Sequence, residues 1–197
     1  ALSSVAEDNP WFMGWERFRA PGLAKLELLS ELTELITRQE TPHRLKLLLF
    51  ESLHGSSLIQ KMAPTLESIL MDQSQVFATR SEAGELLIEA GISMNWTSTI
   101  EELRAEAGEN GIRLAIELMG NVGYDQFDDK LLLEVVLSQL ERVEHTVGVY
   151  FSFERKLSPS RIDAVLDGLS AVARMDLEEH DREQVSAITD LVYGLLA

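Results

Sequence analysis

The stretch RLKLLLFESLHGSSLIQKMAPTLESILMD, residues 44–72, decides the fold class. Its apolar residues recur at helical rather than alternating spacing, and they cover most of the circumference of the first half, as expected for a helix covered on more than one side. The run His54-Gly55-Ser56-Ser57 interrupts the pattern with a glycine that can end one helix and serines that can cap the next. The stretch therefore predicts a helical hairpin with a capped turn.

Pro64 falls inside the second helix of this hairpin. A proline in a helix interior removes one backbone hydrogen bond, so it either kinks the helix or ends it. One kinked helix ending near Met71 and two shorter helices are both compatible with the sequence.

Helical periodicity extends over the rest of the chain, and leucine dominates where a sheet protein would use valine, isoleucine and threonine. Glycines 91, 108 and 120 stand where helices are expected to stop. Only Thr146 to Phe153 has strand-like composition, and we expect helix and loop there because a single strand has no partner. The other expected helices are a short one between Asn9-Pro10 and Pro21, then 23–38, 42–54, 78–90, 97–107, 110–119, 128–144, 158–175 and 181–196.

Short connections between these helices make sequence neighbours antiparallel. The chain contains a weak internal repeat of a cap, a proline, an arginine and an aliphatic residue. Its two copies are Thr41-Pro42-His43-Arg44-Leu45 and Ser158-Pro159-Ser160-Arg161-Ile162. We therefore predict an all-α fold of stacked antiparallel helical hairpins, a HEAT-like α-solenoid, in a single helical-repeat domain spanning residues 1–197.

The segment from Pro42 to Gly91 resembles the degenerate HEAT-like helical repeats that follow the ATPase module in bacterial NTPases of the NACHT and STAND type. The resemblance lies in the helical rhythm, the Gly-Ser-Ser turn, the Ala63-Pro64 pair within a hairpin and the next helix from Arg80. It implies a sensor or scaffold arm, and it transfers no catalytic residue.

The charge distribution limits the classes of partner. The formal net charge is -16, and residues 51–197 hold 26 acidic against 11 basic residues. Such a field repels nucleic acid and anionic lipid, so we expect neither as a partner. The acidic excess is either the solvated outer faces of helices or a docking surface for a basic partner.

The absence of cysteine fits a reducing compartment. The chain has no run of 18 apolar residues without a charge, so we predict no membrane span. The chain begins at Ala1 instead of a methionine and shows no charged-then-apolar leader. We therefore expect a cytoplasmic location and a fragment of a larger protein.

The run His54-Gly55-Ser56-Ser57 is the nearest approach to a catalytic loop. It lacks the GxxxxGK(S/T) pattern of a phosphate-binding loop and the GxSxG elbow of a serine nucleophile. A capped turn explains it better, because either serine can accept the unpaired N–H groups of the next helix. We predict no catalytic residue and no cofactor.

Two groups of residues carry side chains that can bind a metal ion. Glu141 and His145 lie four residues apart, and Glu178-Glu179-His180-Asp181 groups several potential ligands, but neither has HExxH spacing. The acidic run from Tyr124 to Asp129 lacks the glycine and the distal glutamate of an EF-hand, so a helix N-terminus explains it. We predict no metal ligand.

The aromatic residues Trp11, Phe12, Trp15 and Phe18 form the candidate interaction surface. Residues 1–20 can form a lid helix that packs over the first hairpin, since the ends of a solenoid must be covered. Alternatively, the tryptophans anchor a contact with another domain of the parent protein.

Together these features predict a non-enzymatic scaffold or sensor segment that contacts a protein partner or another domain of its own chain. The alternative is a self-contained all-α metal-dependent enzyme, because bundle metal sites take Glu and His from distant helices without a linear motif. A helical secreted effector is a further alternative.

Overall fold

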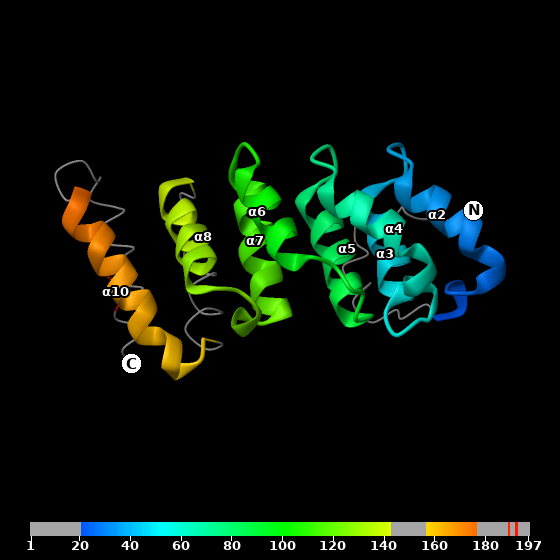
Figure 1. The fold of residues 1–197 in the computed structure, drawn as a ribbon. Helices are drawn as coiled ribbons and strands as arrows, with labels where there is room; N and C mark the ends of the chain where they lie inside the picture. Colours follow the sequence, from blue (N-terminus) through cyan, green and yellow to red (C-terminus); the bar gives the residue numbers. More distant parts are fainter. Residues whose placement is uncertain (1–20, 143–156, 177–188, 190–191, 193–197) are drawn as a thin grey trace. The chain divides into compact units, whose positions relative to one another are not determined.

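The computed structural model describes residues 21–142 and 157–176, together with the isolated residues 189 and 192 (Figure 1). All regular structure in these residues is helical, which confirms the all-α class there. The chain divides into two compact units, residues 1–94 and 95–197. The expected helix in residues 1–20 and the strand-like run 146–153 lie outside the described residues, as does most of the expected helix 181–196. The single repeat domain stays a prediction.

From residue 21 onward, the first unit contains two 3₁₀ turns and four α-helices. Helix α4 packs against α5, α3 packs against α5, and α2 contacts both α3 and α4. Apolar side chains from all four helices are fully buried between them, among them Ile36, Phe50, Leu66 and Leu86. The elements are η2 (Pro21–Leu23), η3 (Leu26–Leu28), α2 (Leu29–Thr37), α3 (His43–Leu53), α4 (Leu58–Met71) and α5 (Phe77–Glu89).

The turn between α3 and α4 is the capped turn that the sequence predicts. Gly55 has φ +71°, in the left-handed region that favours glycine. Ser56 Oγ then accepts a hydrogen bond from Leu58 N at 3.1 Å, at the start of α4. Pro64 lies on the exposed side of α4, which continues through it as a single helix. The open alternative is thus resolved in favour of one helix.

The expected helix 23–38 is wrong in its first third. Regular α-helix starts only at Leu29, because the backbone of Lys25 is extended, with φ -114° and ψ 144°. Two apolar side chains of α2, Leu32 and Ile36, are buried.

The second unit contains four α-helices and one 3₁₀ turn in the described residues. Helix α6 packs against α7, α7 against α8, and α8 against α10. The approach of α7 to α6 is close at Gly111, where an added Cβ would lie 2.3 Å from Leu103 O. The elements are α6 (Trp96–Ala105), α7 (Glu109–Val122), η4 (Tyr124–Gln126), α8 (Asp129–Arg142) and α10 (Pro159–Asp176).

The start of α6 and the end of α7 differ from the prediction in ways that the structure explains. Helix α6 begins at Trp96, because the side chain of Asn95 caps it by accepting a hydrogen bond from Ser98 N at 3.2 Å. Helix α7 passes through Gly120 and ends before Gly123, whose φ of +104° few other residues adopt. A glycine therefore ends the helix as expected, one turn later than predicted.

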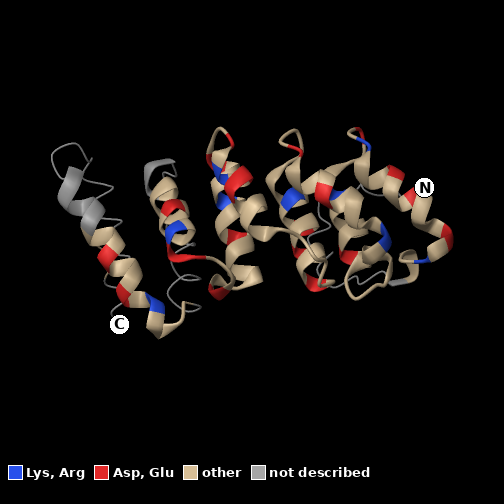
Figure 2. Cartoon of the chain, in the orientation of Figure 1, with Lys and Arg blue, Asp and Glu red and all other residues tan. Residues whose placement is uncertain are grey.

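Acidic residues occur on every described α-helix (Figure 2). Among the described residues, Glu106 is the acidic residue that is buried. The other described carboxylates reach solvent, which agrees with solvated outer helix faces. None of the described helices is long and apolar enough to cross a lipid bilayer.

Candidate functional site

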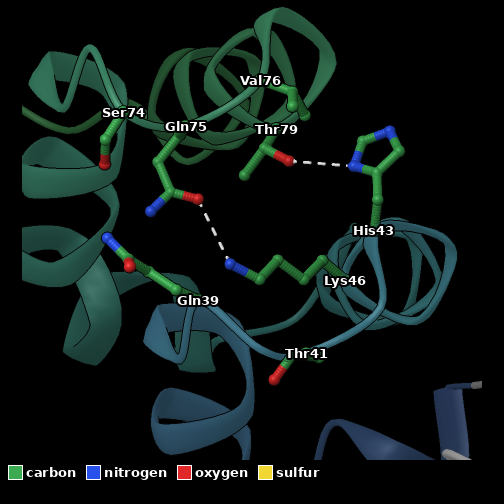
Figure 3. Close-up of a pocket in the computed structure, with 8 residues that line it drawn as sticks. All are labelled: Gln39, Thr41, His43, Lys46, Ser74, Gln75, Val76 and Thr79. Carbon is green, nitrogen blue, oxygen red and sulfur yellow. Dashed lines mark hydrogen bonds between the residues drawn. The ribbon is translucent and has the colours of Figure 1, made fainter.

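A pocket of about 390 Å³ lies in the first unit, where the start of α3, the α4–α5 loop and the start of α5 meet (Figure 3). Its volume falls at the lower end of the range of small-molecule sites. The chain segments that form it are distant in sequence and are brought together by the packing of α3 on α5. The lining residues are Gln39, Thr41, His43, Lys46, Ser74, Gln75, Val76 and Thr79.

Two helix N-termini line this pocket. Helix α3 begins after Pro42 and α5 begins after Val76, and neither start has a side-chain cap. Proline at the α3 start has no hydroxyl or carboxylate with which to cap, and the same holds for valine at the α5 start. Because helix N-termini carry a partial positive charge, both ends favour a negatively charged group nearby.

Lys46 places a full positive charge in the pocket. It sits on the covered side of α3 and is only 4% exposed. In the part of the chain that the structure describes, its ammonium makes one hydrogen bond, to Gln75 Oε1 at 3.2 Å, and no ion pair. Burial lowers the pKa of Lys46, although the negative charges of Asp72 and Glu40 act to raise it. The ammonium is thus buried against a neutral amide (Figure 3).

The amide of Gln75 is held in one orientation. Its Nε2 donates to Asp72 Oδ2 at 3.0 Å while its Oε1 accepts from Lys46. Ser74 adds two hydrogen bonds to Asp72 Oδ1, from its backbone N at 2.9 Å and from its Oγ at 2.7 Å. These bonds from Ser74 and Gln75 lower the pKa of Asp72. Hydrogen bonds to Asp72 therefore hold the α4–α5 loop in place, and the amide oxygen of Gln75 faces Lys46.

Two hydroxyl groups complete the pocket. Thr79 Oγ1 lies 3.2 Å from His43 Nδ1 and is buried at the start of α5. Partial burial and the charge of Lys46 lower the pKa of His43, which favours its neutral form. Thr41 is 7% exposed, and its Oγ1 is buried without a hydrogen-bond partner among the described residues. The pocket thus offers an ammonium, hydroxyls and an amide to a small polar molecule.

A second polar cluster ties the α3–α4 turn to α5. His54 Nδ1 contacts Glu89 Oε2, and His54 Nε2 lies 3.6 Å from Glu82 Oε2. Gly55 N donates to Glu89 Oε1 at 2.7 Å. Burial opposes the charged imidazolium, but the hydrogen bonds and charges of Glu89 and Glu82 outweigh it and raise the pKa of His54. This cluster clamps the turn against α5.

The sequence-predicted aromatic surface, Trp11, Phe12, Trp15 and Phe18, lies outside the described residues, so its role stays a prediction. His145 and His180 lie outside them too. The acidic run before α8 is a helix start, because Asp128 Oδ1 accepts from Leu131 N at 2.7 Å. In residues 21–142 and 157–176, no three His, Asp or Glu side chains are grouped to hold a metal ion.

Sequence reasoning missed the pocket residues. The signal at Lys46 is a single lysine within the apolar run LKLLLF, on a helix predicted to be covered on several sides. Its partner Gln75 lies 29 residues away, and His43 and Thr79 are separated by 36 residues. Only tertiary packing pairs them.

The sequence matches no protein-family model, no curated protein and no solved structure. The resemblance of Pro42–Gly91 to HEAT-like segments of NACHT and STAND NTPases therefore stays a prediction.

Proposed function

We propose that this chain is a cytoplasmic, non-catalytic scaffold or sensor segment that binds a protein partner or another domain of its parent protein. Its helices would stack as antiparallel hairpins of the HEAT-like type. On the resemblance of Pro42–Gly91, the parent would be a bacterial signalling NTPase with this segment as its regulatory arm.

The observation that carries the proposal is packing between sequence neighbours. In the first unit α5 packs on both α3 and α4, and in the second α6, α7 and α8 pack on one another. Repeat proteins are built in this way, since each repeat contacts its neighbours and leaves long faces for binding. The pattern supports an interaction role for both units.

The exposed carboxylates support a partner with a complementary charge. The chain carries 33 acidic and 17 basic residues, and nearly all the acids of the described helices reach solvent. Such a field favours encounter with a basic protein surface and opposes encounter with nucleic acid or anionic lipid.

Site-specific photo-crosslinking in cells that produce the full-length protein tests the proposal. Benzoylphenylalanine would replace Trp15, and a matched variant would carry it at the exposed Lys130 of α8. We expect a discrete crosslink from position 15, either to one protein or to another part of the same chain, and none of that product from position 130. Crosslinks to chaperones alone from position 15 would contradict the proposal.

Deleting residues 1–20 separates the two roles of the aromatic surface. If the aromatic helix is a lid, the truncated chain melts at a lower temperature or aggregates, because the end of the first hairpin is uncovered. If the tryptophans anchor a contact, the thermal midpoint is retained and the crosslinked product is lost.

The non-catalytic part of the proposal has its own assay. The purified chain should show neither stoichiometric ATP binding by calorimetry nor ATP turnover. Metal analysis after purification without chelator or affinity metal provides the second readout. ATP turnover, or a transition metal near one per chain, would sink this part and favour the metal-enzyme alternative.

A further inference from the structure

We propose that the pocket of α3, α5 and the α4–α5 loop binds a small organic monocarboxylate, whose carboxylate accepts from the Lys46 ammonium. This ligand site goes beyond the scaffold or sensor role and does not depend on it.

The buried charge of Lys46 is incompletely paired. Buried lysines are normally paired with a carboxylate, because an ammonium removed from water loses several kcal/mol of hydration. Lys46 is nine-tenths buried, yet its one hydrogen bond within the described residues goes to the neutral amide of Gln75. A carboxylate beside its remaining N–H groups would supply the missing partner.

Other groups around the pocket also favour an anion. The uncapped N-termini of α3 and α5 line the same pocket, and their dipoles reinforce the charge of Lys46. Thr41 adds a buried hydroxyl without a partner in the described residues. The helix ends and the ammonium therefore favour an anionic group in the pocket.

The net charge of the site decides between one and two negative charges on the ligand. Lys46 contributes one positive charge, while His43 is held towards its neutral form. Asp72 and Glu40 act on Lys46 from the loop and from the chain before α3. Because the two carboxylates oppose a dianion more strongly than a monoanion, a monocarboxylate fits better than a phosphate dianion.

The shape of the site favours a free small molecule over an acidic side chain of a protein. The pocket is a concave space of about 390 Å³ bounded by two stretches of chain, residues 39–46 and 74–79. The amide of Gln75 and the hydroxyl of Thr79 also line it and offer hydrogen bonds to a second polar group of the ligand. A small hydroxy acid matches these two requirements.

The experiment is a titration of the ¹⁵N-labelled full chain, followed by ¹H–¹⁵N spectra at constant ionic strength. The probes are sodium lactate, sodium acetate, inorganic phosphate, a blocked glutamate (N-acetylglutamate amide) and sodium chloride. We expect saturable shifts with lactate at the side-chain amide of Gln75 and the backbone amides of His43 and Thr79. Acetate should bind more weakly, and chloride should cause no saturable shift.

Three variants assign the site. Lys46→Met should weaken lactate binding at least tenfold, since it removes the ammonium while keeping an apolar chain that suits burial. Thr41→Val, which keeps the side-chain shape, should weaken binding a few-fold. Lys61→Met alters an exposed lysine of α4 and should bind as the wild type does. Far-UV circular dichroism verifies that each variant is folded.

Several results would overturn the proposal. Shifts that grow linearly with every salt would mean that no carboxylate site exists. Equal lactate affinity in Lys46→Met and the wild type would place the ligand elsewhere. Tighter binding of phosphate would refute the charge argument, and tighter binding of the blocked glutamate would make the pocket a peptide site.

Discussion

In each unit, a cationic side chain on one helix donates hydrogen bonds to residues about 30 positions away in the sequence. The partners of the two cations differ in charge. In the second unit Arg161 of α10 donates from Nε to Asp129 Oδ1 at 2.7 Å and from Nη1 to Tyr124 O at 2.6 Å. In the first unit Lys46 of α3 donates to the amide of Gln75. Lys46 is buried, with 4% of the residue exposed, whereas Arg161 is only partly buried.

The more deeply buried cation thus has the weaker partner. If Lys46 served stability alone, the opposite arrangement would be expected, because a buried charge needs its counter-charge more than an exposed one does. The second unit uses its arginine to join α10 to α8, whereas the first keeps a lysine beside an open pocket. The contrast separates a structural ion pair from a candidate binding site.

The largest effect should come from the tight packing of the second unit. In Gly111→Ala the new Cβ would meet Leu103 O at 2.3 Å, and backbone of a neighbouring helix cannot yield cheaply. We expect the free energy of unfolding to fall by about 2 kcal/mol, after the helix propensity of alanine is included. Urea unfolding followed by far-UV circular dichroism measures this change.

Gly168→Ala is the matched control. Its Cβ would lie 2.6 Å from Leu133 Cδ2, the far end of a side chain that can rotate away. Its unfolding free energy should stay within about 1 kcal/mol of the wild-type value. Equal stability of Gly111→Ala and the wild type would show that α6 and α7 do not approach closely at this glycine.

The next effect tests the ion pair of the second unit. Arg161→Met removes the donors to Asp129 and to the carbonyl of Tyr124, so we expect a loss of about 1.5 kcal/mol. Hydrogen exchange of the amides of α8 and α10 should accelerate with it. Arg161→Lys keeps the charge without the planar fork and should lose less. Unchanged hydrogen exchange in Arg161→Met would show that Arg161 does not hold α10 against α8.

The corresponding variant of the first unit should have the opposite sign. Lys46→Met replaces a buried charge with an apolar chain, so in a buffer free of carboxylates we expect a gain of about 1 kcal/mol in the free energy of unfolding. Lys61→Met should change it by less than about 0.5 kcal/mol. The measurement is again urea unfolding at pH 7. Destabilisation comparable to that of Arg161→Met would mean that Lys46 is structural.

The smallest expected effect is the pH dependence of the turn clamp. The folded-state pKa of His54 is raised above its ordinary value of 6.5, so its stabilising contribution is full below pH 6.5 and is lost as the pH rises through the folded-state value. The lowered pKa of Glu89 keeps its carboxylate ionised in this window. Wild type should exceed His54→Gln in stability by about 0.5 kcal/mol more at pH 5.5 than at pH 8.5.

Thermal unfolding of both proteins at several pH values measures this difference. His43→Gln serves as the control, because the pKa of His43 is lowered and its protonation does not stabilise the fold. A difference between wild type and His54→Gln that is constant with pH would contradict the clamp.

The helices follow from local sequence more closely than the pocket does. The leucine pattern of residues 44–72, the glycine at position 55 and Asp128 before α8 act within one or two turns of chain, so the elements that they specify are predicted correctly. The end of α7 is missed because Gly120 and Gly123 are both plausible stops. The broken start of α2 is missed because the extended backbone at Lys25 is not encoded in apolar spacing.

The pocket is a tertiary property. The run LKLLLF predicts a covered helix, which implies that Lys46 is surrounded by protein, but nothing local indicates that Gln75 and Thr79 face it. Burial without a charged partner is visible only once α3 and α5 are packed together. The same limit applies to Arg161, whose partners are 32 and 37 residues distant.

The packing of helices that lie close in sequence also bears on how the chain reaches its native state. Closing a short loop loses little chain entropy, so helical pairs such as α4 and α5, joined by residues 72–76, can assemble early and without distant segments. Folding rates then depend on local hairpin formation, and the first unit can become structured during synthesis, before α8 and α10 have left the ribosome.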